Sequence, residues 1–87
     1  MNVTYRTDKN ILYIALEGRI DASNSALVEE KIFSIKKENE GKHTVLDADN
    51  LEYISSAGLR VILRLRKEDP DLAIINVAAD VYEVFDM

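Results

Sequence analysis

The sequence predicts an α/β domain built on a mixed four-stranded sheet, with an antiparallel hairpin at its start, parallel strands after it and flanking helices. Two observations predict this class. Two strand-like segments come first, with the turn-forming residues Asp8, Lys9 and Asn10 between them. Segments of helical spacing then alternate with two further apolar segments. Strand–helix–strand units require parallel pairing, whereas a tight turn joins antiparallel strands.

The N-terminal hairpin is predicted from two different patterns. Residues 3–6 alternate between apolar and polar side chains, which is typical of a strand with one solvated face. Residues 11–16 are apolar almost throughout, which indicates a strand covered on both faces.

The first helix is predicted from apolar residues that recur at helical spacing: Leu27, Val28, Ile32 and Ile35. Four residues that commonly cap helices precede them: Asp21, Ser23, Asn24 and Ser25. The pattern does not single out which of the four is the cap. Gly41 stands where a C-terminal cap glycine would end the helix.

The second half of the chain continues the alternation. Residues 44–48 form a short predicted strand, and residues 49–54 form a connector. Ser55 and Ser56 open a second helix that runs through Leu65 or beyond, until the run 69–71 around Pro70 breaks it. Residues 72–77 form a fourth, buried strand, and residues 79–85 begin a third helix.

Composition restricts the class of function. The 87 residues are enough for a single domain, 1–87, and the formal net charge of −5 makes nucleic acid and membrane surfaces poor partners. A protein partner fits better. The chain has no cysteine, no apolar run of membrane-spanning length and no signal-peptide pattern at its start. These features predict a cytoplasmic protein.

Nothing in the sequence indicates an enzyme. The three glycines, Gly18, Gly41 and Gly58, form no phosphate-binding loop, and the single histidine, His43, precedes a strand and is predicted to lie on the surface. Asp47 and Asp49 have the first spacing of a calcium loop, but a leucine follows at the next ligand position. We therefore expect no cofactor and no metal.

Charged and hydroxyl side chains suggest where a partner would bind. Asp21, Asp47 and Asp49 could shape a binding edge, because helix starts and strand ends gather at one end of a parallel sheet; Asp21 could equally be a helix cap, and Asp47 a loop hydrogen-bond acceptor. A basic stripe on the second helix fits either a solvated face or a docking face for an acidic partner: Arg60, Arg64 and Lys67.

The two serines at the start of the second helix also allow two interpretations. Serine is a preferred N-cap, so Ser55 and Ser56 need no purpose beyond opening the helix. A serine at a helix start is nevertheless exposed, and the first amide groups of a helix can receive an anion.

Three segments resemble a known family. Residues 45–59 resemble the central signature of STAS domains, which include the bacterial anti-sigma factor antagonists. Residues 18–21 resemble the segment that precedes the first helix of that family, and residues 76–87 resemble the approach to its third helix. The resemblance covers essentially the whole chain.

The resemblance implies a function and a site. In that family, the antagonist binds an anti-sigma factor that is also a serine kinase, binding frees a sigma factor, and phosphorylation of the antagonist ends the binding. The phosphorylated serine lies two residues before the motif glycine, which places it at Ser56. The family often has aspartate at the preceding position, where this chain has a second hydroxyl, so Ser55 is the alternative acceptor. The predicted partner-binding residues are Asp21, Asp47, Ser55, Ala57, Gly58, Leu59, Arg60 and Arg64.

The resemblance also leaves alternatives. A STAS domain can instead be a sensory or scaffold domain that binds a small ligand or nucleotide, or that regulates a transporter. Family members usually continue beyond the position of Met87, so the chain is expected to be short at its C-terminus. The family implies a monomer, but a missing closing helix would expose apolar sheet surface and favour self-association.

Overall fold

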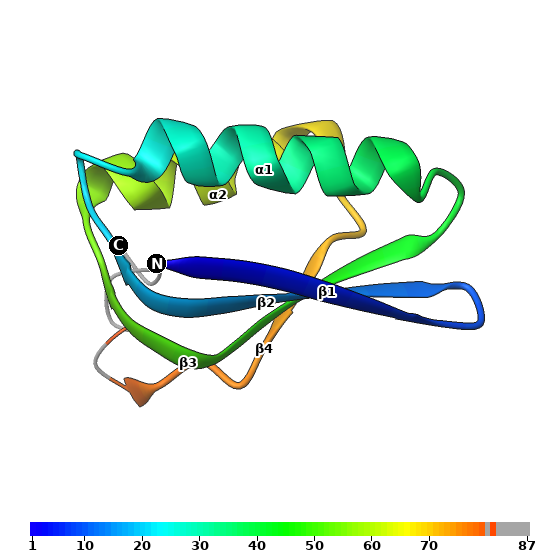
Figure 1. Cartoon of the computed structure of the whole chain (residues 1–87), viewed down its shortest axis with the longest axis horizontal. Helices are drawn as coiled ribbons and strands as arrows, with labels where there is room; N and C mark the ends of the chain where they lie inside the picture. Colours follow the sequence, from blue (N-terminus) through cyan, green and yellow to red (C-terminus); the bar gives the residue numbers. More distant parts are fainter. Residues whose placement is uncertain (80, 82–87) are drawn as a thin grey trace.

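The chain runs through its elements in the predicted order. The computed structural model describes residues 1–79 and 81. Its elements are β1 (Asn2–Asp8), β2 (Ile11–Ile20), α1 (Ser25–Glu38), β3 (His43–Ile54), α2 (Ser56–Glu68) and β4 (Ala73–Ile75) (Figure 1). Among the described residues, no helix is both long enough and apolar enough to cross a membrane.

The sheet has the mixed pairing that the sequence predicts. Its strand order is β1-β2-β3-β4, with β1 antiparallel to β2 and the other two pairings parallel. Asp8 pairs with Ile11, so Lys9 and Asn10 alone form the hairpin turn. Lys9 adopts a positive φ of 56° there. The predicted hairpin and parallel strands are therefore confirmed.

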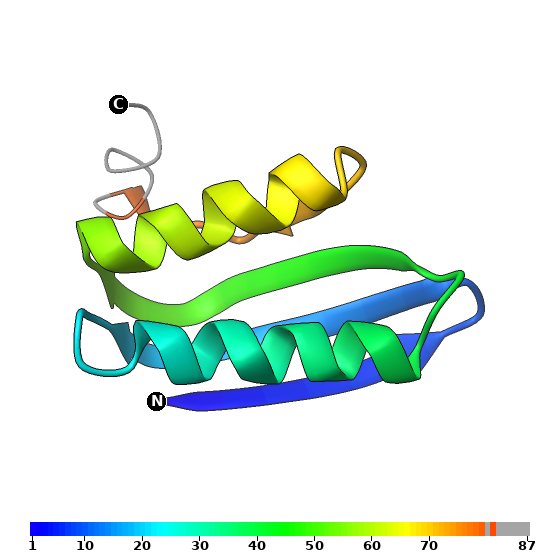
Figure 2. The ribbon, with the colours of Figure 1, turned by 90° about the horizontal axis from the view of Figure 1, so that it is seen from above.

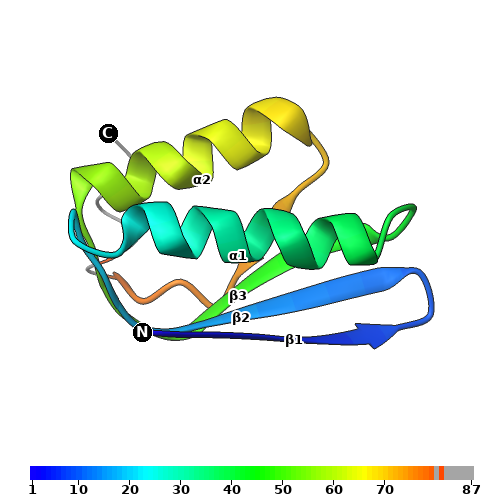
Figure 3. The ribbon, with the colours of Figure 1, turned by 45° about the horizontal axis from the view of Figure 1, so that its top comes forward.

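Both helices cover the same face of the sheet. Figures 2 and 3 show α1 and α2 side by side over the strands. Helix α1 contacts β1 and β2, while α2 contacts β3. The apolar interior lies between the helices and this face of the sheet. Its most buried side chains include Leu12, Ile14, Ile20, Ile32, Leu46 and Leu65.

Strand β3 is much longer than predicted. The expected connector over 49–54 belongs to this strand, which pairs with β2 as far as Ile54. The register shifts twice, between Ala15 and Glu17 and between Gly18 and Arg19, and at each shift β3 contains one residue more than β2. These irregularities let β3 bend and continue, and together they keep Leu51 and Ile54 buried.

Strand β4 is shorter and more exposed than predicted. It covers only Ala73–Ile75 instead of residues 72–77, and Ile75 remains 38% exposed. The prediction of a buried strand was wrong, because β4 lies at the edge of the sheet and its residues are only partly buried or exposed. Ala79 and Val81 have helical backbone, and the rest of the third helix predicted over 79–85 lies outside the described residues.

The ends of α1 also differ from the prediction. Asn24 occupies the N-cap position, but its side chain makes no cap hydrogen bond. Its amide instead accepts from the Asp21 N–H and donates to the Arg19 carbonyl, both at 2.9 Å. The C-cap is Asn39, so Gly41, with a φ of +85°, lies in the turn beyond the helix. Leu27, expected on the apolar face, is 69% exposed.

Candidate functional site

Ser55 is the N-cap of α2. Its backbone is extended, with φ −85° and ψ 173°, and its hydroxyl accepts a hydrogen bond from the Gly58 amide at 3.2 Å. Its own amide donates to the Ile20 carbonyl at 2.8 Å, which ties the helix start to the end of β2. The backbone and side chain of Ser55 are therefore both committed to local structure.

Ser56 is the first residue of α2 and is exposed. Within the described part of the chain, its hydroxyl makes no hydrogen bond. Two serines adjacent in the sequence thus have different environments. The capping serine is half-buried and engaged, whereas the following hydroxyl is open to solvent and to a partner.

Gly58 lets the start of α2 approach the sheet closely. A Cβ atom at this position would lie 2.7 Å from Cγ2 of Ile20 and 2.7 Å from Cγ1 of Ile54. Those two isoleucines pair with each other at the ends of β2 and β3. Gly58 therefore fixes where Ser55 and Ser56 lie relative to the strand ends. The sequence identified this glycine only through the family signature.

Asp21 directly follows β2 and lies beside the start of α2, because the residue before it bonds to Ser55. Its carboxylate accepts hydrogen bonds from the Ser23 hydroxyl and from the Ser23 amide, the latter at 2.9 Å. These bonds favour the ionised form, and the hydroxyl bond contributes most to lowering the pKa of Asp21 below its ordinary value of 3.8. The carboxylate thus orders the loop between β2 and α1.

Asp47 lies away from this cluster. Asp47 pairs with Ala15 in the middle of β2, whereas Asp21 follows Ile20 at the end of that strand. The two aspartates are therefore about five residues apart along β2, or roughly 16 Å. The predicted gathering of Asp21, Asp47 and Asp49 at one end is therefore wrong. It fails because β3 continues beyond Asp47 instead of ending there.

The Asp47 carboxylate holds the loop after β4. One carboxylate oxygen accepts from the Asp49 amide and from the Asn76 side-chain amide, both at 3.0 Å. Asn76 has a positive φ of 60° at this point. The loop hydrogen-bonding interpretation of Asp47 is thus confirmed, whereas a role in partner binding stays a prediction.

The predicted basic stripe divides into two kinds of arginine. Arg64 forms a bidentate pair with Glu29 of α1, at 2.6 and 3.0 Å, and this hydrogen bonding raises the pKa of Arg64. Arg60 is exposed and has no such pair within the described residues. Two adjacent apolar residues between these arginines on α2 also differ in exposure: Ile62 is buried, whereas Leu63 is 57% exposed.

A cation–π pair near Ser55 was missed by sequence reasoning. The Arg19 guanidinium lies 4.3 Å from the centre of the Tyr53 ring, and the two residues pair between β2 and β3. Each precedes a buried isoleucine, so both lie on the sheet face away from the helices. Only the strand register could have revealed this pair.

Ala57 and Leu59, also predicted for the site, are half-buried.

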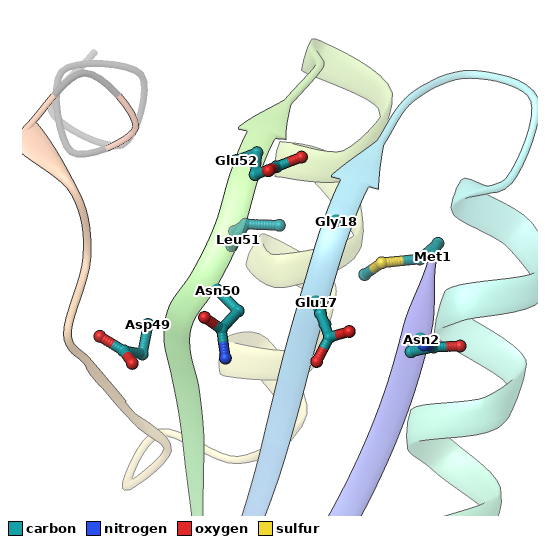
Figure 4. A pocket seen from close by; sticks show the side chains of 8 residues that line it. All are labelled: Met1, Asn2, Glu17, Gly18, Asp49, Asn50, Leu51 and Glu52. Atoms are coloured by element: carbon teal, nitrogen blue, oxygen red, sulfur yellow. The ribbon is translucent and has the colours of Figure 1, made fainter.

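A hollow with a mainly polar lining lies away from the serines. Its volume is about 640 Å³, and Met1 and residues of β1, β2 and β3 line it. Figure 4 shows the side chains of this lining. Its lining carries three carboxylates, those of Glu17, Asp49 and Glu52. Across the described residues, no three side chains of metal-binding type gather closely enough to hold an ion. His43 is exposed, as predicted.

Known proteins share this sequence pattern and fold. The chain is 32% identical to BtrV of Bordetella bronchiseptica, named as an anti-sigma factor antagonist, over 91 aligned positions that cover 100% of this chain and 78% of BtrV. It is 26% identical to the anti-sigma F factor antagonist of Paenibacillus polymyxa, over 91% of this chain and 71% of that protein.

A solved structure has the same fold. The anti-sigma factor antagonist SpoIIAA, in its unphosphorylated form, superposes with a TM-score of 0.70 over 98% of this chain and 82% of its own length, at 17% identity. That likeness concerns the fold alone. The family model described as the STAS domain matches residues 2–87. The chain therefore belongs to the STAS domain family.

Proposed function

We propose that this domain is a cytoplasmic anti-sigma factor antagonist that binds an anti-sigma factor with serine kinase activity. Phosphorylation of Ser56 ends that binding and so regulates sigma-factor-dependent transcription. Membership of the STAS family and the two relatives named as antagonists support this role. In this proposal the domain is the substrate of a kinase and not itself an enzyme, and it requires neither a cofactor nor a metal.

The observation that carries the proposal is the contrast between Ser55 and Ser56. A kinase needs a hydroxyl that it can reach without dismantling the fold. Ser56 is exposed, whereas the Ser55 hydroxyl is held by the Gly58 amide at 3.2 Å. Adding a phosphate at Ser55 would disturb the helix cap. We therefore assign Ser56 as the acceptor.

Charge at Ser56 would affect a complex far more than it affects the domain. A phosphoserine adds roughly −1.5 to −2 charges. At the first turn of a helix the macrodipole favours negative charge by ~0.3–1 kcal/mol. In an interface built around a neutral hydroxyl, the same charge costs on the order of several kcal/mol. Each ~1.4 kcal/mol changes affinity tenfold, so one phosphate is enough to release the partner.

The proposed docking surface surrounds Ser56. Asp21 borders it from the loop after β2, and Ala57, Leu59 and Arg60 border it from the first two turns of α2. Arg64 contributes at most its outer edge, because Glu29 already occupies its guanidinium. Asp47 lies at a different level of the sheet and would meet only a partner that extends across it.

The acceptor can be tested by incubating the domain with candidate anti-sigma factor kinases and ATP, then mapping the phosphate by mass spectrometry. We expect Ser56→Ala to abolish phosphorylation. Ser55→Asp is the matched control, because aspartate keeps an oxygen that can cap the helix. Phosphate that persists in Ser56→Ala but disappears in the control variant would overturn the assignment.

A further inference from the structure

Arg60 lies one helical turn after Ser56 on α2. Both residues are exposed, and residues four apart on a helix are neighbours, with Cβ atoms about 5–6 Å apart. Long helical side chains also lean toward the N-terminus of their helix. The guanidinium of Arg60 can therefore cover the turn that carries Ser56.

Arg60 is available, unlike other arginines nearby. Arg64 is held by Glu29 at 2.6 and 3.0 Å, and Arg19 stacks over Tyr53 at 4.3 Å. Within the residues that the structure describes, Arg60 makes no hydrogen bond, ion pair or ring contact. Binding an anion with Arg60 would thus break no existing interaction.

A phosphomonoester is the group that suits this arrangement. It carries close to two negative charges and three strong acceptor oxygens, and the guanidinium presents paired donors that match two of them. We propose that, when Ser56 is phosphorylated, Arg60 of the same molecule binds the phosphate. This inference rests on the proposed function and deepens it by naming the residue that holds the modified state.

The pairing has two consequences. It gives position 56 a partner for its phosphate, whereas Ser55 lies outside the helix and on a different side from Arg60. It also neutralises Arg60, so a single modification removes both a neutral hydroxyl and a free cation from the docking surface. An acidic partner would lose an attraction and gain a repulsion together.

The test uses the full chain with phosphoserine incorporated at position 56 during translation, so that no kinase is required. The second pKa of the phosphate is measured by ³¹P NMR in this protein, in Arg60→Gln and in the matched control Arg66→Gln. Arg66 is also exposed on α2 but lies in its last turn. Circular dichroism verifies that all three proteins are folded.

We expect Arg60→Gln to raise the phosphate pKa by ~0.1–0.4 units and Arg66→Gln to leave it unchanged. The difference should shrink in 1 M salt, where the Debye length is about 3 Å. Equal phosphate pKa values in all three proteins would overturn the inference and leave the proposed function intact. A kinase that ignores Ser56 would instead overturn the proposed function and leave the NMR result standing.

Discussion

The hydroxyl of Ser55 accepts a hydrogen bond from the amide of Gly58 at 3.2 Å. This single contact separates the two serines at the start of α2. It satisfies one of the amide groups that a helix leaves unpaired at its N-terminus, and it leaves Ser56 with no structural task in the described part of the chain. The first hydroxyl supports the fold, and the second is open to solvent.

Removing the cap should therefore cost more stability than removing its neighbour. We expect Ser55→Ala to lower the free energy of unfolding by about 1 kcal/mol, and Ser56→Ala to change it by less than about 0.5 kcal/mol. Urea denaturation of the two variants measures both values. Equal losses would contradict the division of roles.

Gly58 should tolerate no side chain. Alanine there would place a Cβ 2.7 Å from atoms of both Ile20 and Ile54, in the packed interior. Alanine favours helix over glycine by about 1 kcal/mol. Overpacking costs about 1–3 kcal/mol, and two contacts at 2.7 Å place this case in the upper part of that range, so we expect a net loss of about 1–2 kcal/mol.

Thermal unfolding measures the stability of Gly58→Ala, and Ser56→Ala serves as a solvent-exposed control in the same turn. An alanine variant as stable as the parent would show that α2 does not depend on this close contact. Because Gly58 sets the position of the serines, its substitution should also reduce phosphorylation at Ser56.

The hairpin and the order of elements could be predicted because their signals are local. A two-residue turn, alternating or continuous apolar runs and a proline after α2 all lie within a few residues of what they determine. The start of α2 was predictable for the same reason, since serine is itself the capping group. The family signature then directed attention to Ser56.

The rest depends on contacts between distant residues. Glu29 and Arg64 are 35 residues apart, and Asp47 and Asn76 are 29 apart. Neither pair follows from spacing within one element. The length of β3 depends on two irregularities in its pairing with β2, which no pattern within residues 49–54 encodes.

The pairing of Glu29 with Arg64 should couple the two helices in a salt-dependent way. Charge-neutral variants Glu29→Gln and Arg64→Gln should each lower the unfolding midpoint slightly, and the double variant should lose little more than either one. A double-mutant cycle at low and high salt measures this coupling. Strictly additive effects at both salt concentrations would show that the pair does not hold α1 against α2.

Asp21 should make part of the stability depend on acid pH. Hydrogen bonds from Ser23 lower its pKa in the folded state, so its contribution is complete above the ordinary value of 3.8 and disappears as the pH falls through the folded-state pKa. Asp21→Asn should therefore lose less stability than the parent between pH 6 and pH 3. Identical acid profiles from urea titrations would indicate that the Ser23 bonds are absent in solution.

The affinity of the proposed anti-sigma factor partner for the two forms of this domain tests the central claim most directly. Calorimetry should give a Kd at least ~10-fold weaker for the protein phosphorylated on Ser56 than for the unmodified protein, with Ser56→Ala binding like the latter. Equal affinities for the phosphorylated and unmodified forms, with the phosphate verified at Ser56, would contradict the account.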